Sequence, residues 1–243
     1  MKGRDVAVLI GVILLGWQGV FHFAGAGALP APVDTFIFTI RLAGTSGFWP
    51  HLKETGSAFS WAWTIAVVTG LTVGIALGAH RLSREVAEPV LVALYSIPKV
   101  TLYPVVLLFF GIGMPAKVAF GAIHGIVPIA MFAMNAVRNL NPMYLRTARV
   151  LKLGRWDTAR KVLLPAALPE IFTGLRVGFS LTLIGTLLGE MFGSQRGLGY
   201  LLMTAIGLHR MDTIMAVTLL LVSFATAINS ILLIVDHRLH GQG

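Results

Sequence analysis

Polar and charged side chains stand inside long apolar runs of this sequence, where they are costly unless a partner or a cavity receives them. Arg176 and Glu190 are charged residues in one such run, and two threonines precede Glu190 at a spacing of four, on one helical face. A second polar group surrounds Pro98. Clusters of this kind line passages in transporters. The predicted pathway residues are Tyr95, Ser96, Lys99, Thr182, Thr186 and Glu190.

Structural roles compete with this interpretation. We expect Arg176 to extend to the cytoplasmic surface rather than to contact a solute. For Glu190, helix capping or ion pairing stays open beside pathway lining. A single serine or threonine more often bonds to helix backbone.

Metal and nucleophile chemistry find little support. There is no cysteine, and the histidines form no His-x3-His pair with accompanying carboxylates. No Gly-x4-Gly-Lys-Ser/Thr motif is present to hold ATP phosphates. A membrane-embedded enzyme is therefore the weaker hypothesis. An ion-coupled carrier or channel, with Lys99, Arg176 or Glu190 serving the ion, is the alternative to a transport subunit driven by a separate ATPase. The seven histidines are His22, His51, His80, His124, His209, His237 and His240.

The composition indicates a membrane protein. Of 243 residues, 56% are apolar and 12% charged, and the mean hydropathy is +0.82, which excludes a cytosolic globule and a disordered chain. Apolar runs of about 20 residues match a bilayer core of about 30 Å. We predict an all-α polytopic protein with about six transmembrane helices. The runs are 6–26, 59–79, 89–110, 115–137, 171–192 and 213–235.

The first run resembles a signal peptide because Lys2 and Arg4 precede it. It is longer than a signal's apolar region of about 15 residues, so we expect it to be retained. With both termini in the cytoplasm, twelve of the 19 Lys and Arg residues lie inside and five outside. The net charge of +9 is then mainly a topology signal, and no nucleic-acid partner is expected.

Glycines spaced by four residues predict where the helices pack. Without a hydrophobic driving force in lipid, close association depends on small residues that let backbones approach. The second run and the fifth run carry such series on single faces. The predicted packing residues are Gly70, Gly74, Gly78, Gly185 and Gly189.

The segment 138–169 is the longest internal stretch that is not apolar. Asn141 and Pro142 are typical of a helix start, and a second short helix is expected over 157–163, stopped by Pro165 and Pro169. Seven basic residues and one acid lie between positions 138 and 161. Such a surface binds anionic lipid headgroups or a protein partner, and an ordered helix pair favours the partner.

The stretches Leu-Arg-Thr-Ala-Arg at 145–149 and Val-Leu-Leu-Pro at 162–165 resemble the coupling loop of permease subunits of ATP-binding cassette (ABC) importers. The family pattern is Glu-Ala-Ala, a glycine four residues after the second alanine, and Ile-x-Leu-Pro. Aligned on its ending, the acidic position holds Arg146 and the glycine position Lys152, with Gly154 two residues later. The resemblance implies ATPase-coupling residues at Arg146, Thr147, Ala148, Arg149, Lys152, Gly154, Leu164 and Pro165.

Arg146 reverses the charge that the family pattern has at this position. Either the partner ATPase differs to match it, or the chain forms a heterodimer whose other member keeps the standard loop. Further short stretches, in order along nearly the whole chain, are similar to the nitrate, sulfonate and taurine group of these permeases. They are Ser-Ile-Pro at 96–98, Phe-Phe-Gly-Ile-Gly at 109–113, Thr-Gly-Leu-Arg at 173–176, Glu-Met-Phe-Gly at 190–193 and Gly-Leu-Gly-Tyr-Leu at 197–201.

The resemblance implies a type I ABC importer permease: one transmembrane domain over 1–243 that contains the coupling loop 138–169, in a bacterial inner membrane. It implies two permease chains, two ATPase chains that hold ATP and Mg, and an external solute-binding protein, with no cofactor on this chain. The implied solute is a small anion such as nitrate, bicarbonate, a sulfonate or taurine, although relatives also move pyrimidine-type vitamin precursors.

Overall fold

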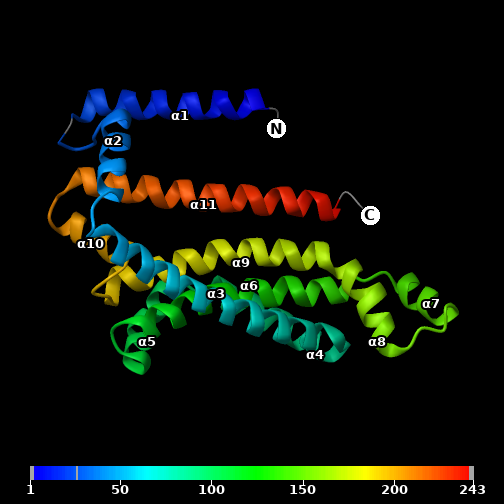
Figure 1. Ribbon diagram of the computed structural model, residues 1–243. Coiled ribbons are helices and arrows are strands. Elements are labelled where there is room, and N and C mark those ends of the chain that lie inside the picture. Colours follow the sequence, from blue (N-terminus) through cyan, green and yellow to red (C-terminus); the bar gives the residue numbers. More distant parts are fainter. Residues whose placement is uncertain (1–2, 26, 241–243) are drawn as a thin grey trace.

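The computed structural model describes residues 3–25 and 27–240, and in those ranges it contains helices and no strands (Figure 1). The all-α prediction is confirmed. The elements are α1 (Gly3–Ala24), α2 (Pro32–Ala43), α3 (Phe48–Ala79), α4 (Arg81–Ser96), the 3₁₀ turn η1 (Lys99–Leu102), α5 (Tyr103–Phe110), α6 (Met114–Arg138), α7 (Pro142–Val150), α8 (Arg155–Thr158), the π-helical turn η2 (Ala159–Leu163), α9 (Leu164–Gly193), α10 (Leu198–Gly207) and α11 (Met211–His240).

Four helical runs in the described ranges are long and apolar enough to cross a membrane. They are α3, α6, the run Trp156–Gly193 that contains α9, and Met211–Asp236 within α11. A fifth candidate consists of α4 followed by Lys99–Phe110, and it is bent by 85°. The α1 helix has 22 residues, about 33 Å at 1.5 Å per residue, and contributes the shorter apolar stretch Val8–Ala24.

The run predicted over 89–110 is broken near Pro98. Ile97 has an extended backbone, with ψ 130°, because a proline ring disfavours the helical conformation of the residue before it. Pro98 also has no N–H to continue the helix. The chain therefore changes direction between α4 and α5, at the polar group that the sequence singled out.

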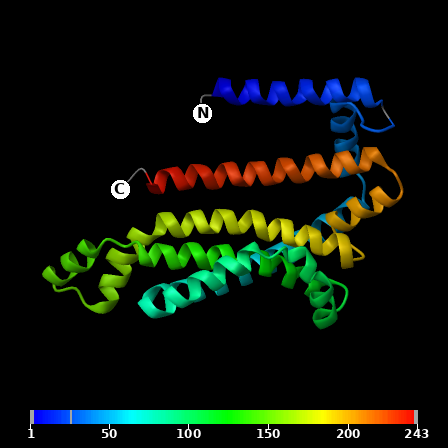
Figure 2. The same cartoon turned by 180° about the vertical axis from the view of Figure 1, so that it is seen from behind.

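The long helices lie side by side, and the connecting segments gather at two opposite ends (Figures 1 and 2). The beginning of α1, the end of α11, and α7 with α8 share one end. At the other end lie α2, α5 and α10. The segments between the long apolar runs at this end contain helices of their own: α2, the first turns of α3, and α10.

The core is a three-helix packing of α6 between α3 and α9, and glycines make the close contacts. A Cβ on Gly70 would lie 2.8 Å from the Ile129 side chain, closer than real carbon atoms approach. A Cβ on Gly185 would lie 2.7 Å from the His124 ring. All five predicted glycines thus meet α6 where a larger residue would clash: Gly70, Gly74, Gly78, Gly185 and Gly189.

The segment after α6 starts its first helix where the sequence predicts, but its second helix is longer than predicted. Asn141 accepts a hydrogen bond from the Met143 N–H at 2.9 Å and caps α7. The second helix does not stop at Pro165 or Pro169, because the helical run continues to Gly193. Pro165 directly follows the π-helical turn η2 at the start of α9, and Pro169 lies inside α9, where a membrane helix tolerates proline.

Candidate functional site

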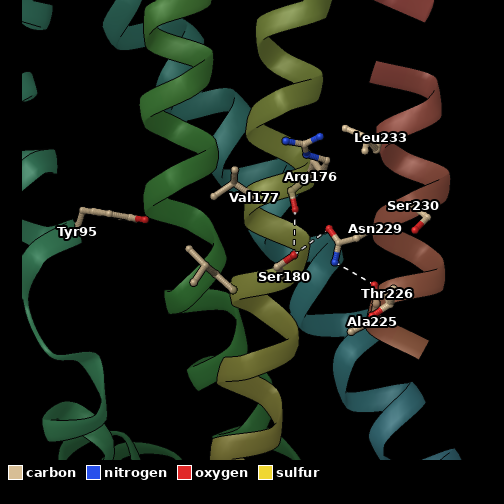
Figure 3. Close-up of a pocket in the computed structure, with 10 residues that line it drawn as sticks. Tyr95, Arg176, Val177, Ser180, Ala225, Thr226, Asn229, Ser230 and Leu233 are labelled. Carbon is tan, nitrogen blue, oxygen red and sulfur yellow. Dashed lines mark hydrogen bonds between the residues drawn. The ribbon is translucent and has the colours of Figure 1, made fainter. Parts of the chain in front are cut away.

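A cavity of ≈ 670 Å³ opens between α4, α9 and α11 within the membrane-spanning helices (Figure 3). Tyr95 approaches from α4, Arg176 and Ser180 from α9, and Asn229 from α11. The polar residues that line this cavity are Tyr95, Arg176, Ser180, Thr226, Asn229 and Ser230. We call it the α9–α11 groove.

A hydrogen bond between Ser180 and Asn229 joins α9 and α11 at this groove, and a second holds Asn229 within α11 (Figure 3). The Ser180 hydroxyl donates to Asn229 Oδ1 at 3.2 Å, and Asn229 Nδ2 donates to the Ala225 carbonyl at 3.0 Å. One turn away, the Arg176 guanidinium lies 3.3 Å from Asp236 Oδ2. The Arg176 side chain keeps 28% of its surface exposed. Arg176 is therefore held by an ion pair rather than extended freely to the surface, and still faces the groove.

Sequence reasoning missed Asn229 and Asp236. Asp236 follows the predicted end of the sixth run by one residue, and the sequence alone does not indicate that it pairs with Arg176. Asn229 belongs to a polar series with Thr226 and Ser230, at helical spacing, in a run without charges. That spacing was the available signal for a polar face on α11.

The three predicted pathway residues near Pro98 do not all line the groove. Tyr95 lines the groove, whereas Ser96 and Lys99 do not. The Ser96 hydroxyl donates to the Val92 carbonyl at 2.9 Å. Lys99 Nζ donates to the Tyr95 carbonyl at 3.1 Å and lies 5.1 Å from the centre of the Tyr95 ring. Lys99 thus links the start of η1 to the last turn of α4 across the break at Pro98.

The predicted stripe on α9 is buried against α6 instead of facing the groove. Thr182, Thr186 and Glu190 each have 0% exposure. Thr186 Oγ1 donates to the Thr182 carbonyl at 2.9 Å, and the two threonines pack at Gly125 and Gly121 of α6. In this arrangement of the chain the stripe reaches no open passage.

Glu190 is the centre of a buried polar network at the end opposite α7. The Thr55 hydroxyl donates a hydrogen bond to Glu190 Oε2 at 2.8 Å, and the Gly199 N–H donates to the same oxygen at 3.0 Å. Lys117 Nζ lies 3.8 Å from Glu190 Oε1 and donates to Glu54 Oε1 at 2.8 Å. Of the roles that the sequence left open for Glu190, the geometry is that of pairing and capping, because its carboxylate holds the start of α10.

The coupling segment presents its basic residues outward. Arg146, Thr147 and Arg149 are exposed on α7, while Ala148 is buried at 2% exposure. Leu164 and Pro165 are exposed at the start of α9.

Lys152 closes α7 in a left-handed conformation, with φ 50°. The Leu153 N–H bonds to the Ala148 carbonyl at 3.0 Å, and the Lys152 N–H bonds to the Arg149 carbonyl at 3.0 Å. This is a Schellman motif, whose left-handed position favours glycine. Lys152 thus occupies the place where the resembled pattern has glycine, and Gly154 does not replace it, since no positive φ is recorded there.

Comparison with known proteins identifies the family. A family model described as the binding-protein-dependent transport system inner membrane component matches residues 66–241. The chain belongs to this family. Its members are permease subunits of ABC transporters, so this chain is a transport subunit and ATP hydrolysis is supplied by a separate subunit.

Relatives and solved structures agree with this assignment. The taurine transport system permease protein TauC of Escherichia coli is 30% identical, over 88% of this chain and 81% of the relative. The putative aliphatic sulfonates transport permease protein SsuC of Bacillus subtilis is 30% identical, over 84% of this chain and 74% of the relative. An inward-facing structure of the MetNI methionine ABC transporter has the same fold, with a TM-score of 0.68 at 20% identity over 79% of this chain and 96% of that chain.

The described residues contain no group of three or more His, Cys, Asp and Glu side chains that would hold a metal ion. Three polar regions follow from the geometry above: the α9–α11 groove, the Glu190 network and the basic coupling segment.

Proposed function

We propose that this permease moves a small anion through its α9–α11 groove, with a second permease chain completing the passage. The observation that carries the proposal is the polar lining of the groove within helices that are otherwise apolar. A polar helix face is unfavourable against lipid, so a water-filled passage or another protein surface must cover it. The relatives named for taurine and for aliphatic sulfonates support a small anionic solute.

Arg176 is the cation of the groove. One of its guanidinium nitrogens faces Asp236, which leaves further N–H donors on a partly exposed planar group. Ser180 and Asn229 add uncharged hydrogen-bonding groups beside it. A sulfonate, nitrate or bicarbonate oxygen accepts hydrogen bonds from such groups, and a cation already paired with a carboxylate would hold the anion weakly enough to release it.

The coupling role falls to α7. Its exposed basic residues and its rigid Schellman closure suit a lever on which an ATPase subunit pushes, and this supports docking of the ATPase at Arg146 and Arg149. In this arrangement α7, α8 and both termini are cytoplasmic, and ATP and Mg are bound by the partner. The end that carries α2 and α10 would then meet the external solute-binding protein.

The test begins with purification of the tagged permease from bacterial inner membranes in mild detergent. We expect mass spectrometry to find an ABC ATPase and one or two kinds of permease chain. Uptake of labelled taurine, an alkanesulfonate, nitrate and bicarbonate is then measured in proteoliposomes with the copurifying ATPase and its binding protein. If uptake of the solutes proceeds at the same rate when the ATPase is left out, the permease is an ion-coupled carrier and the proposal is refuted.

Arg176→Gln tests the groove itself. We expect at least tenfold slower uptake, because a hydrogen bond to a charged group contributes about 1.5–3 kcal/mol. Asn229→Ala, which leaves the ion pair intact, should also slow uptake. The matched control is Arg84→Gln on α4, outside the groove, with uptake unchanged. Equal uptake by all three variants and the parent protein would place the passage elsewhere.

A further inference from the structure

A second cavity, of ≈ 530 Å³, lies where the core helices end near α8. Its walls include Ile75 in the last turns of α3, Val137 at the end of α6, and Leu163 and Ile171 from the η2–α9 run. These walls are apolar. Trp156 and Arg160 complete the lining from α8 and η2. We call this space the α8 cavity.

The level of the α8 cavity follows from its lining. Residues of α3 and α6 that contribute to it lie within a few positions of the helix ends at Ala79 and Arg138, so the cavity is at the boundary of the apolar spans. Trp156 is 75% exposed there. Tryptophan is enriched at this depth of a bilayer because its ring is apolar and its N–H is polar.

Arg160 gives the α8 cavity its charge. Among the described residues it has no hydrogen-bond or ion-pair partner, whereas the adjacent Lys161 pairs with Asp157 at 2.9 Å. The π-helical turn Ala159–Leu163 contributes Arg160 and Leu163 to the same space. Wide turns of this kind are frequently found at functional sites.

We propose that the α8 cavity binds an anionic phospholipid, with an acyl chain among Ile75, Val137 and Ile171 and the phosphate on Arg160. Charge complementarity selects this occupant: an unpaired guanidinium stands at the rim of an apolar cavity, in a segment with seven basic residues and one acid. Basic pockets between membrane helices on the cytoplasmic side bind anionic headgroups. The volume is within the range of about 300–1,000 Å³ that holds small ligands.

No residue of α7 lines this cavity, and of the implied coupling residues only Leu164 does, at the start of α9. The lipid would hold α8 in place against the ends of α3 and α6, next to α7, on which the ATPase is proposed to act. The inference rests on the cytoplasmic position proposed for α7 and α8, since anionic lipid of the cytoplasmic leaflet must reach the cavity.

Quenching of tryptophan fluorescence by brominated lipids tests the site in proteoliposomes without ATPase. The contribution of Trp156 is the difference between the parent protein and the Trp156→Phe variant. We expect brominated phosphatidylglycerol to quench it with about fivefold higher apparent affinity than brominated phosphatidylcholine, which corresponds to about 1 kcal/mol per basic residue near an anionic surface. Equal quenching by both lipids would overturn the proposal.

Two variants separate headgroup from acyl chain. Arg160→Gln should remove the preference for phosphatidylglycerol, and the matched control Arg149→Gln, on α7 outside the cavity, should keep it. Ala79→Leu, which fills part of the cavity from the exposed end of α3, should weaken quenching by both lipids. If Arg160→Gln and Arg149→Gln lose the preference for phosphatidylglycerol equally, that preference comes from general surface charge, and the proposed lipid site is refuted.

The ATPase supplies the last test. If its addition abolishes the quenching, the α8 cavity belongs to a protein interface and the lipid proposal fails. Because the measurement needs neither ATP nor solute, the two proposals fail separately. A permease without ATP-driven uptake but with selective quenching contradicts the transport proposal alone, and the reverse result contradicts the lipid site alone.

Discussion

Replacing Lys117 with methionine removes the cation of the Glu190 network while keeping an unbranched side chain of similar length. Lys117 Nζ donates to Glu54 Oε1 at 2.8 Å and to the Arg196 carbonyl at 3.1 Å, and it lies 3.8 Å from Glu190 Oε1. The lysine is 1% exposed and Glu190 is fully buried. The variant therefore leaves a buried carboxylate without its neighbouring cation.

The expected cost follows from these distances. Two unit charges 4 Å apart interact by about 4 kcal/mol at an effective dielectric of about 20. Removing one partner of a buried ion pair destabilises proteins by about 3–5 kcal/mol. Volume loss adds little, because Met fills nearly the space of the lysine stem. We expect Lys117→Met to lower the free energy of unfolding by about 3–5 kcal/mol.

The assay is unfolding of the purified permease in mixed micelles, followed by tryptophan fluorescence. The matched control is Lys53→Met on the exposed surface of α3, for which we expect a change within about 0.5 kcal/mol. Adding Glu190→Gln to Lys117→Met should recover at least half of the loss, because the uncompensated charge is gone while Thr55 and Gly199 still find an acceptor. A loss no greater than that of the control, or no recovery in the double variant, would refute the electrostatic reasoning.

Two further predictions concern backbone positions, and the same unfolding assay measures both. Gly74→Ala should destabilise the permease by about 1–3 kcal/mol, because the new Cβ would lie 2.7 Å from that of Ala133. Its control is Gly56→Ala on the same helix, where a Cβ meets no atom within 4 Å and the change should be neutral or stabilising. Equal effects of the two substitutions would contradict glycine packing. Lys152→Gly should stabilise by up to about 1 kcal/mol, because it relieves a left-handed backbone, and destabilisation would contradict the Schellman assignment.

Local signals in the sequence located the parts of this permease that depend on local physics. The apolar runs predicted α3, α6, α9 and α11 because the length of apolar chain needed to cross a bilayer is fixed by the bilayer. Asn141 predicted the start of α7, since a capping side chain reaches only the next few N–H groups. The coupling-loop resemblance indicated the family that the comparison then showed.

Tertiary structure alone decided what the polar side chains do. Glu190 meets Thr55, which is 135 residues away in sequence, and Arg176 meets Asp236, so the partners of both charges lie on other helices. The groove exists only because α11 brings Asn229 beside Ser180. Hydropathy is a property of each helix by itself, but the partner of a buried polar group depends on which faces meet, and that is set by packing among all the helices.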